Sequence, residues 1–172
     1  MQRPYVRTMA VEPVNQIKQL DDLDWHILKE LQENARLSFA ELGRIVNLSR
    51  PAVAERMKRL EEMGVIAGYR AEINLSSLGY GITAFVRLST QGDQVEPLIA
   101  TVKDTPEVLE CHRGTGSDSF ILKVAVSSLW HLENVLDKFM RFGQVSTSIL
   151  LSSVLTKRIV TEGIAGFEGK KE

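Results

Sequence analysis

The spacing of the apolar residues changes once along this chain, near Gly68, and this change limits the possible folds more than any other feature. Before Gly68, apolar residues recur three and four positions apart, which is the period of an α-helix with one buried face. After it, apolar and polar residues alternate over short stretches, as in half-buried β-strands. A chain of 172 residues can form two small domains. We therefore expect a helical domain followed by an α+β domain.

Two helices are predicted before residue 47. The first follows a group of aspartates, whose negative charge is favourable at a helix N-terminus. Its apolar face is formed by residues four positions apart: Leu23, Ile27 and Leu31. Ser38, followed three positions later by Glu41, predicts a capping box at the start of a second, short helix.

A tight turn and a third helix are predicted next. Asn47 tolerates the left-handed conformation that a tight turn needs. Ser49 can cap the following helix, and Gly64 can end it. Gly43 is small at a position where two helices must cross closely. Short helix, tight turn and longer helix in this order are typical of a helix-turn-helix.

Positive charge is concentrated between residues 44 and 59, although the whole chain has a formal net charge of −1. Five basic residues and the single acidic Glu55 give this stretch a net charge of +4: Arg44, Arg50, Arg56, Lys58 and Arg59. A local basic stripe on a nearly neutral protein indicates phosphate contact at one site. The alternative is an amphipathic helix whose charged face is only solvated. The capped short helix and the turn favour DNA binding.

The second half of the chain predicts a ferredoxin-like βαββαβ domain. Residues 69–73 alternate, and residues 78–81 predict a turn. Strands are predicted at residues 82–88, 108–112, 120–126 and 146–154, with helices at residues 95–102 and 129–140. Helices on one face leave the other face of the sheet open. We expect self-association to cover that open face, which we expect to carry Ala84, Val86, Ile149 and Leu151.

Residues 114–119, Gly-Thr-Gly-Ser-Asp-Ser, join two of these predicted strands. They are not a dinucleotide fingerprint, because the third glycine is missing and a strand follows where a helix is required. Such a loop can offer backbone N–H groups and hydroxyls to a carboxylate, and Asp118 can pair with an ammonium group. An amino acid carries both charges. The other interpretation is a hairpin with polar turn residues.

Nothing in the sequence favours an enzyme, and we predict no catalytic and no metal site. The three histidines are far apart and lack metal-ligand spacing: His26, His112 and His131. Cys111 and His112 are adjacent on a predicted strand, so they should point to opposite faces. No apolar run reaches the ~20 residues of a membrane helix, and no secretory signal is recognisable. A single cysteine fits a reducing compartment, so we expect a cytoplasmic protein without a membrane partner.

Four segments, in order, resemble one known family: DLDWHILKELQENARLSFAELGRIVNLSRPAVAERMKRLEEMGVIAGYRAEIN, LGYGITAFVRL, PEVLECHRGTGSDSFILKVAV and TSILLSSV. They resemble the leucine-responsive/asparagine regulator (Lrp/AsnC) family of transcription regulators. The resemblance implies an α+β protein with an N-terminal helix-turn-helix (winged-helix-like) domain and a C-terminal ferredoxin-like RAM domain that binds ligand. It also implies dimers formed through the sheet, which assemble into octamers or similar rings.

We accordingly expect five regions along the chain. They are a flexible arm at residues 1–20, a helix-turn-helix domain at 21–68, a linker at 69–81, a ligand-binding and oligomerisation domain at 82–156 and a tail at 157–172. The arm and the tail fall outside the family pattern.

The resemblance implies that the third helix lies in the major groove of double-stranded DNA. Base edges would then be approached by residues at its N-terminal end: Ser49, Arg50, Ala52, Ala54 and Glu55. Arg50 is the candidate for a bidentate contact to guanine, while Lys58 and Arg59 would contact phosphate. Arg56 either joins this surface or pairs with Glu61 or Glu62. Arg44 either reaches the DNA backbone or is solvated.

Family members bind amino acids at the loop, in a cleft between dimers and with help from neighbouring chains, so the resemblance implies an amino-acid effector and no cofactor. The candidate ligand-binding residues are Thr115, Gly116, Ser117, Asp118 and Ser119, with Thr147 and Ser148 as further contributors. The predicted function is a sequence-specific, nucleoid-associated regulator gated by a small effector. Two alternatives are an architectural DNA-wrapping protein without an effector and a regulatory subunit of a metabolic enzyme, which the basic helix-turn-helix disfavours.

Overall fold

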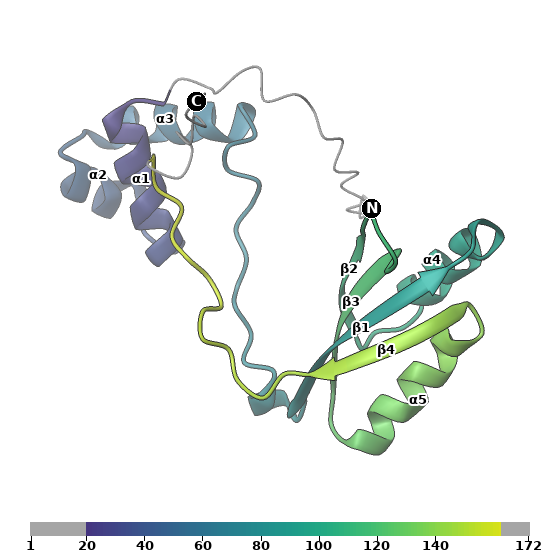
Figure 1. Cartoon of the computed structure of the whole chain (residues 1–172). Helices are drawn as coiled ribbons and strands as arrows, with labels where there is room; N and C mark the ends of the chain where they lie inside the picture. The colour runs from purple at the N-terminus through teal and green to yellow at the C-terminus, as the bar shows by residue number, and fades with distance from the viewer. Residues whose placement is uncertain (1–19, 163–172) are drawn as a thin grey trace, which may run out of the picture. The chain divides into compact units, whose positions relative to one another are not determined.

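The computed structural model describes residues 20–162 and divides them into two compact units (Figure 1). One unit contains residues 20–70 together with residues 157–162, and the other contains residues 71–156. The predicted arm before residue 20 and the end of the predicted tail after residue 162 lie outside the described residues.

The first unit contains three helices, and each begins at a side-chain cap. They are α1 (Asp22–Glu33), α2 (Phe39–Val46) and α3 (Arg50–Glu62). Asp21 and Asp24 form a capping box on α1, and Ser38 and Glu41 form the predicted box on α2. These caps satisfy backbone N–H groups that have no partner inside the helix. The helix-turn-helix prediction is confirmed.

The turn between α2 and α3 depends on two residues with special backbone requirements. Asn47 adopts the left-handed conformation, with φ 56°. Gly43 lies so close to the turn that a Cβ atom there would be 2.5 Å from the carbonyl oxygen of Leu48. Below this turn the three helices share a small apolar core: Ile27, Leu42, Val46, Val53, Met57 and Leu60.

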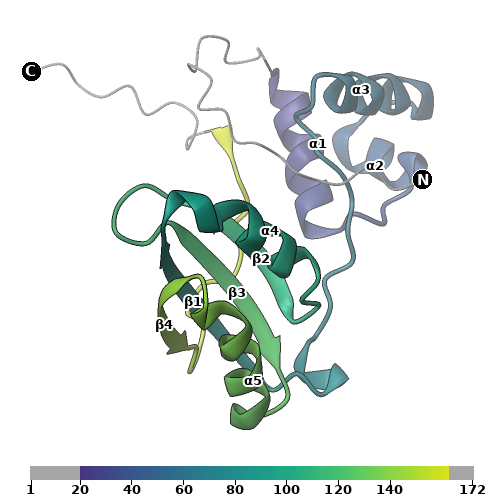
Figure 2. The same cartoon turned by 90° about the vertical axis from the view of Figure 1, so that its right-hand side faces the viewer.

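The second unit is a four-stranded antiparallel sheet with two helices packed on one face (Figure 2). Its strands are β1 (Ile82–Thr90), β2 (Val108–Arg113), β3 (Phe120–Val126) and β4 (Gly143–Ile149), in the spatial order β2-β3-β1-β4. Helices α4 (Val95–Lys103) and α5 (Leu129–Met140) complete the βαββαβ order, and short 3₁₀ turns lie at Ser76–Leu78 and Gly92–Gln94. The predicted ferredoxin-like class is confirmed.

The prediction of which β1 side chains lie on the open face of the sheet is wrong by one position along the strand. Ala84 and Val86 are fully buried beneath the helices, and the open face instead carries their neighbours Phe85 and Arg87. The two alternating sets of side chains in β1 both contain apolar residues, so alternation alone did not show which set faces the helices. A shift of one residue exchanges the two faces. Ile149 pairs with Ala84, so its side chain also belongs to the helix-covered side.

Two predicted strands also differ from the structure. β4 begins and ends earlier than predicted, and its last bond to β1 is the one from Leu150 N–H to the Thr83 carbonyl, at 2.9 Å. Beyond this point β1 offers no further partner, so Leu151 is outside the sheet and 95% exposed. Residues 69–73 alternate in sequence but form no strand in the described structure, because no neighbouring strand pairs with them.

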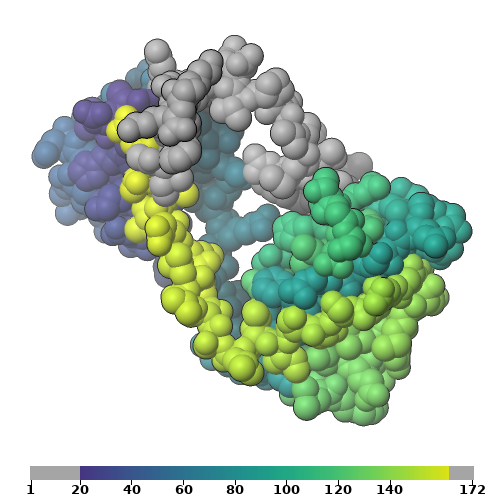
Figure 3. Space-filling model, viewed as in Figure 1, coloured from purple at the N-terminus to yellow at the C-terminus, as the bar shows by residue number. Residues whose placement is uncertain are grey.

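The segment that follows β4, yellow in Figure 3, is largely exposed. Beyond it, Val160 belongs to the first unit and pairs with Gln32 of α1. The Gln32 side-chain amide donates to the Val160 carbonyl at 3.0 Å, and its oxygen accepts from the Val160 N–H at 2.8 Å. The chain thus returns to the helical unit after completing the sheet.

Candidate DNA-binding helix and candidate ligand loop

The N-terminal end of α3 presents the residues predicted to read DNA. The Ser49 hydroxyl is the helix cap and accepts a hydrogen bond from the Ala52 N–H at 3.4 Å. Arg50 and Glu55 are exposed, while Ala52 and Ala54 are half-buried between them. Among the described residues, none forms a hydrogen bond or ion pair with the Arg50 guanidinium. Its planar donors are therefore available to an outside acceptor.

Two basic residues of α3 bind carboxylates at the start of α1. Arg56 Nη1 donates to both oxygens of Asp21, at 2.8 and 2.7 Å, and to Oδ1 of Asp24 at 2.8 Å. Arg59 Nη2 donates to Oδ2 of the same Asp24. The hydrogen bond from Arg56 is the main reason that the pKa of Asp21 lies below its ordinary value of 3.8. The four side chains join α1 to α3 directly.

The alternative that Arg56 pairs with Glu61 or Glu62 is not realised. Those glutamates follow Arg56 by five and six positions, whereas neighbours on a helix surface are three or four positions apart. Glu61 instead accepts a hydrogen bond from the Tyr69 hydroxyl at 2.9 Å. Desolvation and this bond raise the pKa of Tyr69 to about 12.

Of the two predicted phosphate contacts, Lys58 is the more accessible. Its side chain is 76% exposed and lies 3.7 Å from Glu62, an ion pair of the kind that solvent weakens. The Arg59 side chain is 48% exposed, but its guanidinium is already bonded to Asp24. Arg44 is exposed on α2. The basic stripe of the sequence is therefore divided between charges that face solvent and charges held by the fold.

Asp21 and Asp24 were not among the residues expected to contact the basic helix. One signal was available, because Asp24 lies three and seven positions before Ile27 and Leu31, on the face that the apolar residues define. A carboxylate at a core position needs a counter-charge, since an unpaired buried charge is very costly. The pattern could not show that the counter-charges lie about 35 residues further on.

The candidate ligand loop, residues 114–119, is the hairpin between β2 and β3. The Gly114 N–H donates to the Ser119 carbonyl at 3.0 Å and closes the loop. Thr115, Gly116 and Ser117 are exposed, and Asp118 is half-buried. Gly116 has φ 106°, a backbone conformation that residues with a Cβ atom rarely adopt. The loop therefore presents backbone and hydroxyl groups to solvent on a constrained turn.

Ser119 joins this loop to the end of β1. Its hydroxyl lies 3.5 Å from both the N–H and the carbonyl oxygen of Thr90. The Thr90 hydroxyl in turn donates to the Phe142 carbonyl at 2.7 Å, immediately before β4. The base of the loop is thus connected to the start of β4 within one chain.

The other two predicted ligand residues lie elsewhere on β4. Thr147 and Ser148 are adjacent on this strand, so their side chains point to opposite faces of the sheet. The loop ends beside Ser89 of β1, whereas Ser148 pairs with Phe85, four residues further along that strand. In addition, β1 separates β4 from β3. At strand spacings this is roughly 13 Å along the sheet and about 10 Å across it. One chain does not bring them beside the loop.

The open face of the sheet carries several polar side chains that contact one another. Lys123 lies 3.0 Å from Glu110, and His112 lies 3.4 Å from the same carboxylate. The hydrogen bond from Lys123 is the main reason that the pKa of Glu110 is lowered. Arg87 donates to the Ser148 hydroxyl at 3.4 Å. Cys111 pairs with Leu122, and His112 with Ile121, so these neighbours face opposite sides as predicted.

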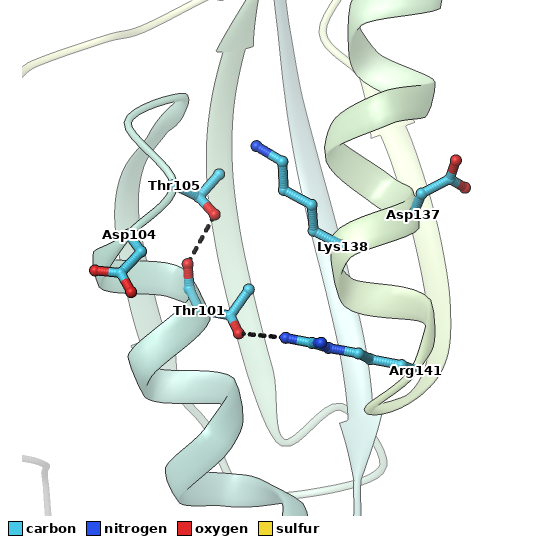
Figure 4. A pocket seen from close by; sticks show the side chains of 6 residues that line it. All are labelled: Thr101, Asp104, Thr105, Asp137, Lys138 and Arg141. Carbon is cyan, nitrogen blue, oxygen red and sulfur yellow. Dashed lines mark hydrogen bonds between the residues drawn. The ribbon is translucent and has the colours of Figure 1, made fainter.

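An open groove of about 370 Å³ lies between α4 and α5 (Figure 4). It is lined by Thr101, Asp104, Thr105, Asp137, Lys138 and Arg141. Arg141 donates to the Thr101 hydroxyl at 3.1 Å, and Lys138 lies 3.7 Å from Glu107. Both of its cations therefore have internal partners, and none of the predicted site residues lines it.

Within residues 20–162, no helix is both long and apolar enough to cross a bilayer. No three His, Cys, Asp or Glu side chains gather in a way that could hold a metal ion in this same part of the chain.

A helix-turn-helix followed by a βαββαβ unit defines the class of two-domain DNA-binding regulators. Residues 20–61 match the AsnC-type helix-turn-helix domain, and residues 83–160 match the Lrp/AsnC ligand binding domain. The chain belongs to the Lrp/AsnC family of transcription regulators, which are not enzymes.

Its similarity to individual relatives covers most of both chains. It is 41% identical over 134 residues to the uncharacterized HTH-type transcriptional regulator YezC of Bacillus subtilis, with 78% of this chain and 95% of the relative covered. The solved structure of Bacillus subtilis LrpC is 31% identical, with a TM-score of 0.77, and covers 81% of this chain and 100% of that one. A regulator from Neisseria meningitidis, NMB0573, solved as a complex with L-Met, has 31% identity and a TM-score of 0.77, with 83% and 96% covered.

Proposed function

We propose that this chain is a sequence-specific transcription regulator whose oligomeric second unit binds an amino acid or a similar small effector. DNA would be read by Ser49, Arg50, Ala52, Ala54 and Glu55, with Lys58 contacting phosphate. The effector would bind at residues 115–119. The site of action would be the nucleoid.

One observation carries the DNA-binding part of this proposal. The N-terminal end of α3 is exposed beside a capped tight turn, and Arg50 there has no partner among the described residues. A guanidinium in this position at the start of a recognition helix suits the two acceptors of guanine in the major groove. Because such proteins bind as dimers, the operator should be an imperfect palindrome with half-sites about 34 Å apart.

The effector part is supported by the chemistry of the loop and by a relative. The half-buried Asp118 carboxylate can pair with an ammonium group, and nearby N–H and hydroxyl groups can bind a carboxylate. The similar Neisseria regulator was solved with L-Met. An α-amino acid is therefore the class of ligand to test.

Self-association would complete this site. Thr147 and Ser148 are too far from the loop of their own chain to touch the same small ligand, so they would contribute through a second copy. No helix within residues 71–156 packs on the sheet face that carries Phe85 and Arg87, and this face would form the dimer contact. Further assembly of dimers into octamers or similar rings would bring loops and strands of different dimers together.

Fluorescence anisotropy of labelled DNA from upstream of the chain's own gene tests this function. The full chain should prefer this DNA over a scrambled duplex, and one or a few of the twenty amino acids should shift the affinity about 5- to 150-fold. Arg50→Ala should weaken the specific complex and leave the oligomer size unchanged. Asp118→Ala should abolish the effector response and retain DNA binding. Tight binding that no amino acid changes would favour an architectural protein instead.

A further inference from the structure

Asp24 is the one fully buried charged side chain among the described residues. Its carboxylate lies between α1 and α3 and receives hydrogen bonds from the guanidiniums of Arg56 and Arg59. It also accepts from the Asp21 N–H at 3.2 Å, while the Asp21 carboxylate accepts from the Asp24 N–H at 2.8 Å. The capping box of α1 and the ion pairs to α3 are therefore one network.

The contacts that this network makes between the two helices are directional hydrogen bonds. Apolar packing permits small rotations of one helix on another, whereas hydrogen bonds to a charged group weaken steeply when their angles change. Arg56 and Arg59 are one helical turn apart, and both hold the same carboxylate. Asp24 thereby fixes both the rotation and the height of α3 relative to α1.

The network also changes how much positive charge the basic stripe offers to DNA. Two guanidiniums are matched by the carboxylates of Asp21 and Asp24, so the four side chains together are neutral. The cations left on the stripe are Arg44, Arg50 and Lys58. A count of basic residues in the sequence thus overstates the number of phosphates that the stripe can neutralise.

We propose that Asp24 is a positioning residue for DNA recognition: an internal counter-ion that orients the recognition helix and withholds Arg56 and Arg59 from phosphate. The inference rests on the proposed DNA-binding role of α3. It replaces the predicted phosphate contact of Arg59 with a contact inside the protein. Specific reading then depends on the helix orientation, while the salt dependence of binding depends on the fewer remaining cations.

The salt dependence of DNA affinity in the full-length chain tests this. The slope of log K against log salt falls by about 0.9 for each phosphate that the protein no longer neutralises, which is about 3.5-fold in affinity over a fourfold salt range. Lys58→Ala should reduce the slope by about 0.9, whereas Arg59→Gln should leave it at the wild-type value. An equal reduction in Arg59→Gln would overturn the inference and leave the proposed function intact. A wild-type chain that binds no DNA would overturn both.

Asp24→Asn tests the same network by removing the negative charge that holds the two guanidiniums. Releasing one or two guanidiniums should steepen the slope by about 0.9 to 1.8, raise affinity for scrambled DNA and lower the preference for specific DNA. A loss of stability alone would not steepen the slope. Asp22→Asn is the matched control, because it removes one negative charge from the same helical turn at an exposed position outside the network. An equal change in slope in both variants would overturn the inference, and Arg59→Gln decides it if Asp24→Asn does not fold.

Discussion

The two units of this chain differ in what is buried beneath their helices. In the sheet unit, twelve buried residues form one apolar core, and its buried polar residue, Thr105, is uncharged. The helical unit has six buried apolar residues and the buried carboxylate of Asp24. Burial stabilises without directional requirements, whereas ion pairs with hydrogen bonds specify an orientation. The unit with the smaller core is also the one in which the orientation of a helix matters for reading DNA.

The largest loss of stability should come from a substitution that creates a cavity in the core of the sheet unit. Phe139 of α5 is fully buried against the sheet, so Phe139→Ala should lower the free energy of unfolding by about 3–5 kcal/mol. Each unit contains one of the two tryptophans, Trp25 and Trp130. Urea unfolding followed by Trp130 fluorescence, in a Trp25→Phe background, therefore reports on this unit.

The control for that change lies on the same helix. Leu129 is 62% exposed, so Leu129→Ala should change the free energy of unfolding by less than about 0.5 kcal/mol. Equal destabilisation of the two variants would mean that apolar burial under α5 does not carry the stability of this unit.

A smaller destabilisation is expected at the helix-turn-helix. Gly43→Ala places a Cβ atom 2.5 Å from the Leu48 carbonyl oxygen, and backbone must move to relieve that contact. Such overpacking costs about 1–3 kcal/mol. Trp25 fluorescence in a Trp130→Phe background should show the destabilisation, while Ala40→Ser, at an exposed position of the same helix, should cost about 0.5 kcal/mol or less. Equal stabilities would contradict the close crossing at Gly43.

Helix starts and the tight turn were predictable because they depend on local chemistry. Ser38 and Glu41 are three positions apart, and Asn47 needs no distant partner to favour a left-handed turn. The order of strands and helices was also predictable from the periods of the apolar residues. The covered face of β1 was not, because Phe85 is as apolar as its buried neighbours, and the position of the helices decides the face.

The candidate site was predictable to a lesser extent. Lys58 and Arg59 are adjacent basic residues with equal formal charge, so the sequence alone predicts the same contact for both. Their difference arises from a carboxylate on another helix. Likewise, the family resemblance grouped Thr147 with the loop at residue 115, whereas strand order separates them within one chain. Both differences arise from tertiary contacts between residues far apart in sequence.

A third substitution tests whether residues 157–162 contribute to the free energy of unfolding of the helical unit. Gln32→Ala removes both hydrogen bonds to Val160 and should cost about 1 kcal/mol at the Trp25 signal, since exposed bonds contribute little. Gln32→Glu keeps the acceptor for the Val160 N–H and loses the donor, so it should cost about half as much. No difference between Gln32→Ala and wild type would place residues 157–162 outside the cooperative unit.

The smallest effect should be an acid sensitivity confined to the helical unit. The Asp21 carboxylate is 51% exposed, and its pKa is lowered first by the hydrogen bond from Arg56. A carboxylate with a lowered pKa in the folded state stabilises the fold fully above its unfolded value, near 3.8, and loses that contribution as the pH falls through the folded value. Because solvent screens an exposed pair, the destabilisation should be only about 0.5 kcal/mol. Asp21→Asn should therefore flatten the pH dependence of the Trp25 transition below pH ~4 and leave the Trp130 transition unchanged. An equal flattening of both transitions would mean that the two units unfold as one, and that the directional network and the apolar core are not energetically separate.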